Sequence, residues 1–170
     1  FMNIDNKSKK WIALYTKPKH EKSVANQLDS KGFEVYLPLL KERRKWSDRK
    51  KWIEYPLFKS YLFARIFKRE AINISNTPGV VKIVKFSNRI AIVNENSIQA
   101  IKLMLDGGYN PEPTDYFIKG DLVTVKDGPL KGLEGEVVNM GGNDRLIIRI
   151  ESIQHSISVK INRAFLLKRK

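Results

Sequence analysis

The chain has 170 residues, no cysteine and an ordinary apolar fraction of 42%, enough for one domain or two small ones. The lack of cysteine excludes disulfide frameworks, thiol nucleophiles and cysteine-bound zinc. The formal charge of +14 is unevenly spread: residues 1–110 hold 22 Lys and Arg against 10 Asp and Glu, and residues 111–170 hold 10 against 8. Because a concentrated basic field attracts phosphates, we expect the first part of the chain to work near nucleic acid.

In chain order, the first part mixes strand and helix patterns. We expect strands at 11–16, 33–37, 60–67, 80–84 and 90–93, with a turn at Ser87-Asn88 before the last of them. Helices are expected at 19–31, 69–75 and 95–105. Residues 39–46 and 51–58 read as the arms of an extended hairpin with a polar tip at 47–49.

The second part has a different character. Residues 107–116, which hold two glycines and two prolines, are predicted to be a linker. Beyond it we expect five short strands, at 122–125, 134–139, 146–150, 156–161 and 164–167. Five short strands in so few residues favour a small barrel, which removes sheet edges by closure.

Several classes of protein are disfavoured by what is missing. No apolar run reaches the roughly 20 residues needed to span a bilayer, and the polar stretch from Asn3 has no apolar signal core. We take Met2 as the native start and expect a cytoplasmic protein without membrane contact. The two histidines are far apart, and neither a GxxxxGK[ST] loop nor a GxGxxG turn is present. We therefore expect no enzyme activity, no cofactor and no metal site.

The segment GDLVTVKDGPLKGLEGEV, residues 120–137, is the most specific signal. Val123 and Val125 alternate onto one face, Asp127-Gly128-Pro129 suits a tight turn, and two later glycines would let the strand bend as a barrel closes. The segment resembles a KOW motif. Its key positions would be Gly120, Asp121, Val123, Gly128, Pro129, Gly132, Gly135 and Val137.

The first part resembles the N-terminal domain of the NusG family of transcription factors. The resemblance rests on WIALYTK at 11–17, YLP at 36–38, PLFKSYLF at 56–63 and TPGV at 77–80, followed by the KOW motif. It implies an α+β fold with three parts. These are a four-stranded antiparallel sheet flanked by helices over 8–106, the linker, and an SH3-like β-barrel over 117–170.

The same resemblance implies a function and partners. A member of the family binds the clamp helices of the largest subunit of bacterial RNA polymerase and modulates pausing and termination. Its barrel recruits a further partner, such as a ribosomal protein or a termination factor. We expect such a factor to act as a monomer. The alternative is a KOW-containing, RNA-binding protein associated with ribosomes, although the second part carries little of the positive charge.

Within the family, the chain is more similar to the specialised RfaH type, which implies an operon-specific antiterminator. Ser60 precedes Tyr61 where housekeeping members usually carry a Pro-Gly pair, and the segment 83–86, IVKF, also resembles that type. Residues 70–73, EAIN, do not match the His-Thr-Thr-Thr element with which RfaH contacts the second polymerase pincer.

Two kinds of binding residue are predicted. Strand alternation puts Tyr61, Phe63 and Arg65 on one side, where we expect an exposed aromatic face that binds polymerase, extended by Ile83 and Phe86. The alternative is that both strand aromatics belong to the core.

The second set is predicted to contact DNA or RNA. The hairpin segment 41–52 has seven basic residues against two acidic ones, with interleaved tryptophans, a composition that suits phosphate contact and base stacking. The alternative is a solvated hairpin whose tryptophans pack on the sheet. A second cluster is expected at the turn before the first helix. The predicted residues are Lys17, Lys19, His20, Arg43, Arg44, Lys45, Trp46, Arg49 and Lys50.

Overall fold

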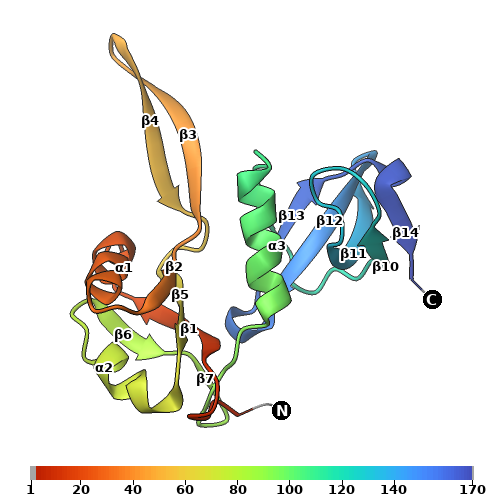
Figure 1. Cartoon of the computed structure of the whole chain (residues 1–170). Helices are drawn as coiled ribbons and strands as arrows, with labels where there is room; N and C mark the ends of the chain where they lie inside the picture. Colours follow the sequence, from red (N-terminus) through yellow and green to blue (C-terminus); the bar gives the residue numbers. More distant parts are fainter. Residues whose placement is uncertain (1–2, 170) are drawn as a thin grey trace. The chain divides into compact units, whose positions relative to one another are not determined.

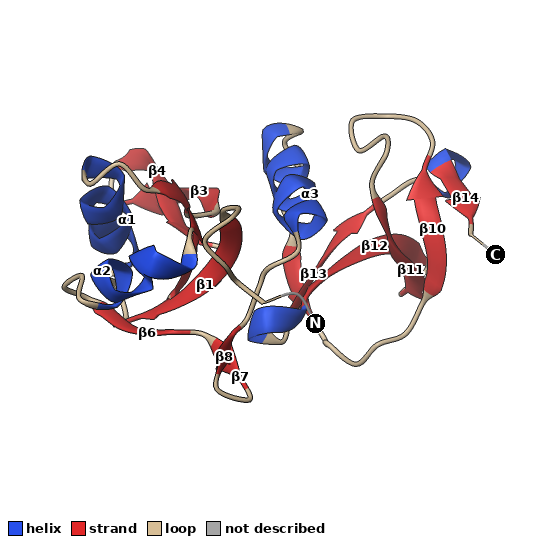
Figure 2. Cartoon of the chain, turned by 60° about the horizontal axis from the view of Figure 1, so that its bottom comes forward, coloured by secondary structure: helices blue, strands red, loops and turns tan. Residues whose placement is uncertain are grey.

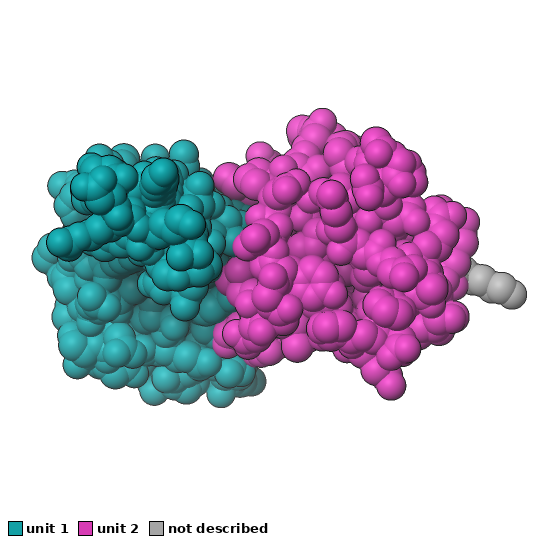
Figure 3. Space-filling view, turned by 90° about the horizontal axis from the view of Figure 1, so that it is seen from above, with its two compact units in different colours: residues 1–93 teal, residues 94–170 magenta. Residues whose placement is uncertain are grey.

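Two compact units appear in the computed structural model, which describes residues 3–169: residues 1–93 and residues 94–170 (Figure 3). The division falls before the helix α3 (Glu95–Asp106), whereas the sequence assigned this helix to the first domain. Within the second unit, the hydroxyl of Ser97 at the start of α3 donates to the carbonyl of Arg149 at 3.3 Å. That contact helps to explain why α3 groups with the second unit.

The first unit is built on a four-stranded antiparallel sheet, as predicted. Its strands run in the order β2-β5-β1-β6 (Figure 1). Their bounds are β1 (Lys10–Thr16), β2 (Glu34–Tyr36), β5 (Tyr61–Ile66) and β6 (Val80–Ile83). The central pair, β1 and β5, buries nine of its thirteen residues and leaves the other four half-buried.

One face of this sheet is covered by helices α1 (Glu21–Ser30) and α2 (Ala71–Ser75), the latter following a 3₁₀ turn at Lys68–Glu70 (Figure 2). Apolar side chains from helices and sheet are removed from water together here, which is the main source of stability. The core consists of Ile4, Ile12, Leu14, Val24, Leu28, Leu62, Ala64, Ile66, Ile74 and Ile83.

The start of α1 and the start of β5 are joined by buried polar contacts. Ser60 has a positive φ of 64°; its amide donates to the buried carboxylate of Glu21 at 2.8 Å, and its carbonyl accepts from the amide of Thr16 at 2.8 Å. Gly79, with φ of 94°, lies so close to α1 that a Cβ there would meet the side chain of Val24 at 2.8 Å. The positive φ and this close approach explain why the TPGV segment has a glycine at position 79.

A long two-stranded arm, inserted in the chain between β2 and β5, extends away from this sheet (Figure 1). It consists of β3 (Leu39–Trp46) and β4 (Arg49–Pro56). The predicted hairpin is confirmed, but its tip is shorter than expected. Trp46 pairs directly with Arg49, which leaves a two-residue turn, and Ser47 takes a positive φ of 46° there. The second arm therefore starts two residues earlier than the sequence suggested.

A smaller hairpin follows β6, formed by β7 (Lys85–Phe86) and β8 (Arg89–Ile90). Ser87 and Asn88 both have positive φ, 47° and 63°, as a two-residue hairpin turn of type I′ requires. The predicted turn at these two residues is confirmed.

The second unit contains a six-stranded antiparallel sheet in the order β14-β10-β11-β12-β13-β9. The strands are β9 (Glu112–Thr114), β10 (Asp121–Val125), β11 (Glu134–Met140), β12 (Asn143–Ile150), β13 (His155–Lys160) and β14 (Leu166–Lys168). Short 3₁₀ turns lie at Glu151–Ile153 and Arg163–Phe165. Within residues 3–169 no pairing joins β14 to β9, so the expected closed barrel is not found.

The first strand of this sheet, β9, lies inside the predicted linker, which is therefore not free of structure. Pro113 pairs with Ile157 of β13, and Glu112 forms an ion pair of 2.7 Å with Arg145. Arg145 is buried, and it also donates to the hydroxyl of Ser158 at 2.8 Å. A buried guanidinium needs such partners, and the linker residue Glu112 supplies one of them.

The glycines of the KOW-like segment act in different ways. Gly128 and Gly132 have positive φ, 81° and 90°, and both belong to the turn region before β11. The sequence analysis expected Gly132 to let a strand bend, but Gly132 lies in this turn and not in a strand. Gly135 lies within β11, where a Cβ would meet the carbonyl oxygen of Ile147 at 2.8 Å. Val123 and Val125 are buried on one face, as predicted.

We predict that Gly135→Ala destabilises the protein by about 2–3 kcal/mol, because the added methyl group is forced against the neighbouring strand. Gly141→Ala is the matched control: its φ is 58° but a Cβ would meet nothing within 4 Å, so the cost is only about 1 kcal/mol of backbone strain. Urea unfolding of both variants measures the difference. Equal losses would show that β11 and β12 are packed less closely than described.

Candidate binding surfaces

The face of the first sheet opposite the helices is aromatic. Because β1 and β5 are antiparallel, Tyr15 lies opposite Tyr61 and Ala13 lies opposite Phe63, and these four side chains share that face. The two tyrosine rings are 5.3 Å apart. The predicted alternation is therefore confirmed, since Leu62, Ala64 and Ile66 all belong to the core beneath the helices.

The exposure of this face differs from the prediction. Phe63 is fully buried, with its ring 6.0 Å from that of Phe58 and 6.5 Å from that of Tyr36. Ile83 is also buried, at 5% exposed, and belongs to the core. The expectation that these two residues are exposed was wrong, because neighbouring side chains cover them.

The other three predicted polymerase contacts remain at least partly accessible. Tyr61 and Arg65 are half-buried, and Phe86 is 68% exposed at the β7–β8 hairpin. Burial, together with the neighbouring Tyr15, raises the pKa of Tyr61 above its ordinary value. Arg65 lies 3.6 Å from the carboxylate of Glu34 on β2. The surface is thus aromatic with a charged edge.

Tyr15 is a member of this face that the sequence analysis missed. It lies half-buried beside Tyr61, and the ammonium of Lys82 sits 5.9 Å from its ring centre. The signal was available: Trp11, Ala13 and Tyr15 alternate with the core residues of β1. The pairing of β1 with β5 was needed to show that the two tyrosines meet.

The hairpin arm formed by β3 and β4 exposes all its residues from 41 to 52. Trp46 is 75% exposed and Trp52 is 64% exposed, so the alternative in which both tryptophans pack on the sheet is wrong. At the root, the amide of Leu57 donates to the carbonyl of Pro38 at 2.9 Å, and the ammonium of Lys22 on α1 donates to the carbonyl of Glu54 at 3.1 Å. The arm is therefore held by hydrogen bonds at its base, and residues 41–52 beyond the base are exposed to solvent.

Most of the positive charge on the arm is uncompensated. Lys41 pairs with Glu54 at 3.3 Å and Arg44 pairs with Glu42 at 3.1 Å, both at the surface. Among residues 3–169, no ion pair involves the five remaining basic residues of the arm, which are Arg43, Lys45, Arg49, Lys50 and Lys51. Exposed, unpaired cations of this kind suit contact with phosphates.

The turn before α1 brings Lys17, Lys19 and His20 together, all exposed. Lys19 has a positive φ of 64°, and the amide of Lys17 donates to the carbonyl of Gly79 at 2.9 Å. The carboxylate of Glu21 already lies in the first turn of the helix, so it offsets the positive end of the helix dipole. Any attraction for phosphate at this turn therefore comes from the lysines.

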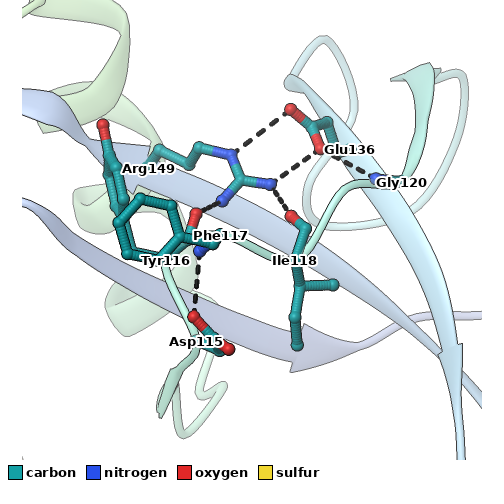
Figure 4. Close-up of polar contacts among 7 residues, drawn as sticks. All are labelled: Asp115, Tyr116, Phe117, Ile118, Gly120, Glu136 and Arg149. Atoms are coloured by element: carbon teal, nitrogen blue, oxygen red, sulfur yellow. Dashed lines mark hydrogen bonds and ion pairs between the residues drawn. The ribbon is translucent and has the colours of Figure 1, made fainter.

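In the second unit, one ion pair organises the segment leading into the KOW-like motif (Figure 4). The guanidinium of Arg149 contacts Glu136 at 2.8 Å and donates to the carbonyls of Tyr116 and Ile118. Glu136 also accepts from the amide of Gly120 at 2.9 Å. The pair of Glu136 on β11 and Arg149 on β12 was not identified by the sequence analysis, because lone charged residues on strands carry no distinctive spacing.

The described part of the chain contains neither a cluster of metal-binding side chains nor a helix that could span a membrane. Residues 3–169 contain no cluster of three or more side chains suited to hold a metal ion. No helix within the same residues is both long enough and apolar enough to cross a bilayer.

Comparison with known proteins gives two kinds of similarity. The family model "Transcription termination factor nusG" matches residues 9–102, more than half of the chain. No curated protein matches the sequence. A solved structure on domain interaction in Thermotoga maritima NusG is 19% identical, with a TM-score of 0.52, and the match covers 95% of this chain and 98% of that one.

A second solved structure, of the MjSpt4:Spt5 complex in conformation B, is 18% identical over 93% of this chain and 95% of that one, with a TM-score of 0.31. At 19% identity, the similarity to the Thermotoga structure supports only the fold. The TM-score of the Spt4:Spt5 complex is too low to support any conclusion about this chain.

Acid should weaken the second unit through Glu136. The hydrogen bonds from Arg149 lower the pKa of Glu136 below its ordinary 4.5, with the amide of Gly120 helping. The carboxylate therefore stabilises the fold fully above the unfolded pKa, and this contribution is lost as the pH falls through the lower folded value. We predict that Glu136→Gln costs about 1–3 kcal/mol at pH 7 and progressively less as the pH falls below the ordinary pKa of 4.5, as measured by urea unfolding of the full chain. The control Glu134→Gln, at a surface pair with Arg169, should cost less at pH 7. A pH-independent loss at Glu136 would contradict the assignment.

Proposed function

The chain belongs to the NusG family, and on that premise we propose that it is a transcription elongation factor that binds RNA polymerase through its first unit. The observation that carries the proposal is the family match over residues 9–102. A binding role, rather than catalysis, also suits the aromatic face and the basic arm. The proposal places the protein in the cytoplasm, where bacterial polymerase works.

We assign the polymerase contact to the aromatic face and its neighbour at the β7–β8 hairpin. Tyr15, Tyr61 and Arg65 form the partly accessible centre, and Phe86 extends the surface. Tyrosine and arginine are enriched among the residues that carry most binding energy at interfaces. Phe63 would support this surface from beneath. The clamp helices of the largest subunit are the proposed partner, as the family resemblance implies.

The specialised role rests on fewer residues. Ser60 keeps a left-handed backbone conformation where a glycine would be unstrained, and the resemblance to the RfaH type supports an operon-specific antiterminator. The second unit would then recruit a ribosomal protein or a termination factor.

In vitro transcription with purified polymerase tests the whole proposal. Templates should carry one pause and one terminator, and we expect the protein to increase read-through of both. Binding to ribosomes without any effect on transcription would instead favour the ribosome-associated alternative.

For the polymerase contact, we predict that Tyr61→Ala combined with Phe86→Ala weakens binding to core polymerase about 10-fold or more, since each aromatic contributes on the order of 1–2 kcal/mol at an interface. The folded state should survive, because neither side chain is fully buried. The matched control is Ile72→Ala, which removes a side chain 71% exposed on α2 and should bind normally. Undiminished binding of the double variant would move the docking face elsewhere.

For the arm, we predict a salt-sensitive contact with DNA or RNA in the elongation complex. Arg43, Lys45 and Lys50 share one face and form no ion pair among residues 3–169. Replacing all three with alanine should flatten the slope of log affinity against log salt by about two units, since each phosphate contact contributes roughly 0.7–0.9.

The charge-matched control for this prediction replaces Lys126, Lys131 and Lys160, three exposed lysines of the second unit, with alanine. Salt titrations should use a bubble-containing complex and, separately, isolated clamp helices. The arm variant should bind the helices normally. If it loses binding to the helices, the arm contacts polymerase protein instead of nucleic acid.

A further inference from the structure

The arm has two faces of different composition. In an antiparallel pair, directly opposite residues point to the same side and successive residues alternate. Arg43 lies opposite Trp52, whereas Trp46 lies opposite Arg49. The two tryptophans therefore point to opposite sides of the arm. One face holds Lys41, Arg43, Lys45, Lys50, Trp52 and Glu54, and the other holds Glu42, Arg44, Trp46, Arg49 and Lys51.

Each face keeps positive charge beside its tryptophan. On the Trp52 face, Lys41 is paired with Glu54, which leaves three cations uncompensated. On the Trp46 face, Arg44 is paired with Glu42, which leaves Arg49 and Lys51. Both faces of the arm therefore carry unpaired cations beside a tryptophan, and both are suited to bind a polyanion.

The fold makes no use of either ring. Trp46 and Trp52 are 75% and 64% exposed, and within residues 3–169 neither takes part in a ring contact or a cation–π pair. Trp11, by contrast, is only 2% exposed. Most of the surface of each indole side chain is therefore available, and an aromatic ring on a basic surface is the arrangement on which single-stranded bases stack.

One strand on one face cannot reach both rings. They point to opposite sides, and Trp46 lies three residue positions beyond the level of Trp52, about 10 Å along the ribbon. We propose that the arm binds two single strands of nucleic acid at once, one on each face, with Trp52 stacking on a base of one strand and Trp46 on a base of the other.

This inference deepens the proposed function and rests on it for its setting, because a transcribing complex contains separated strands. The geometry favours a forked substrate, in which two single strands diverge from one duplex and the arm lies between them. Stacking does not distinguish the four bases, so binding should depend little on sequence. The experiments below use the full-length protein and no polymerase, so that their failure is distinct from failure of polymerase binding.

Tryptophan fluorescence reports on each face separately. In Trp46→Phe only Trp52 remains exposed, in Trp52→Phe only Trp46 remains exposed, and the buried Trp11 adds a constant background. Titration with oligothymidylate should quench the exposed ring in both variants. Oligouridylate, run in parallel, tells whether DNA or RNA is preferred. If either ring keeps its full fluorescence at saturation, the arm is one-sided and the proposal is overturned.

Affinity for a fork tests whether both strands bind together. We expect a duplex with two unpaired oligothymidylate arms to bind about 10-fold more tightly than a duplex with one arm, a modest value for one added base stack. Trp46→Ala and Trp52→Ala should each abolish this preference. The control Phe117→Ala, which removes an aromatic side chain 81% exposed in the second unit, should retain it. Equal affinity of the wild-type protein for both duplexes would overturn the proposal, even if polymerase binding is intact.

Discussion

The register between β1 and β5 is the constraint on which the first unit depends. Leu14 lies opposite Leu62 and faces the helices, and one position along, Tyr15 lies opposite Tyr61 and faces away. Because strand side chains alternate, a slip of one residue would exchange the two faces and place the tyrosines in the core. The burial of Leu14, Leu62 and Ile66 against the helices therefore fixes the position of the aromatic surface that we assign to polymerase.

The hairpin arm obeys the same alternation without any layer to pack against. A two-stranded ribbon is marginally stable alone, and this arm is attached only at its base, through contacts such as that of Leu57 with Pro38. Its composition beyond the base cannot be explained by a core, since Trp46 and Trp52 are largely exposed. Interaction with a partner is the remaining physical reason to hold two large aromatic rings among cations in water.

The second unit is organised by charge as much as by apolar packing. Arg145 and Arg149 each join a strand of the sheet to the segment that precedes β10, through Glu112 in one case and the carbonyl of Tyr116 in the other. A guanidinium can serve several acceptors at once, so one side chain orders several backbone groups. This explains how a proline- and glycine-rich stretch, which composition alone marks as a linker, comes to contribute a strand.

The sequence by itself determined what depends on neighbours along the chain. Period-two alternation predicted the strands and the two sides of β5, and the turn residues Ser87, Asn88 and Gly128 predicted their turns, because these signals are local. Only the tertiary structure decided what depends on distant residues. It buried Phe63 and Ile83, paired Arg149 with Glu136, and exposed Trp46 and Trp52. Whether a side chain is covered depends on which other segments reach it, and a single strand pattern contains no record of them.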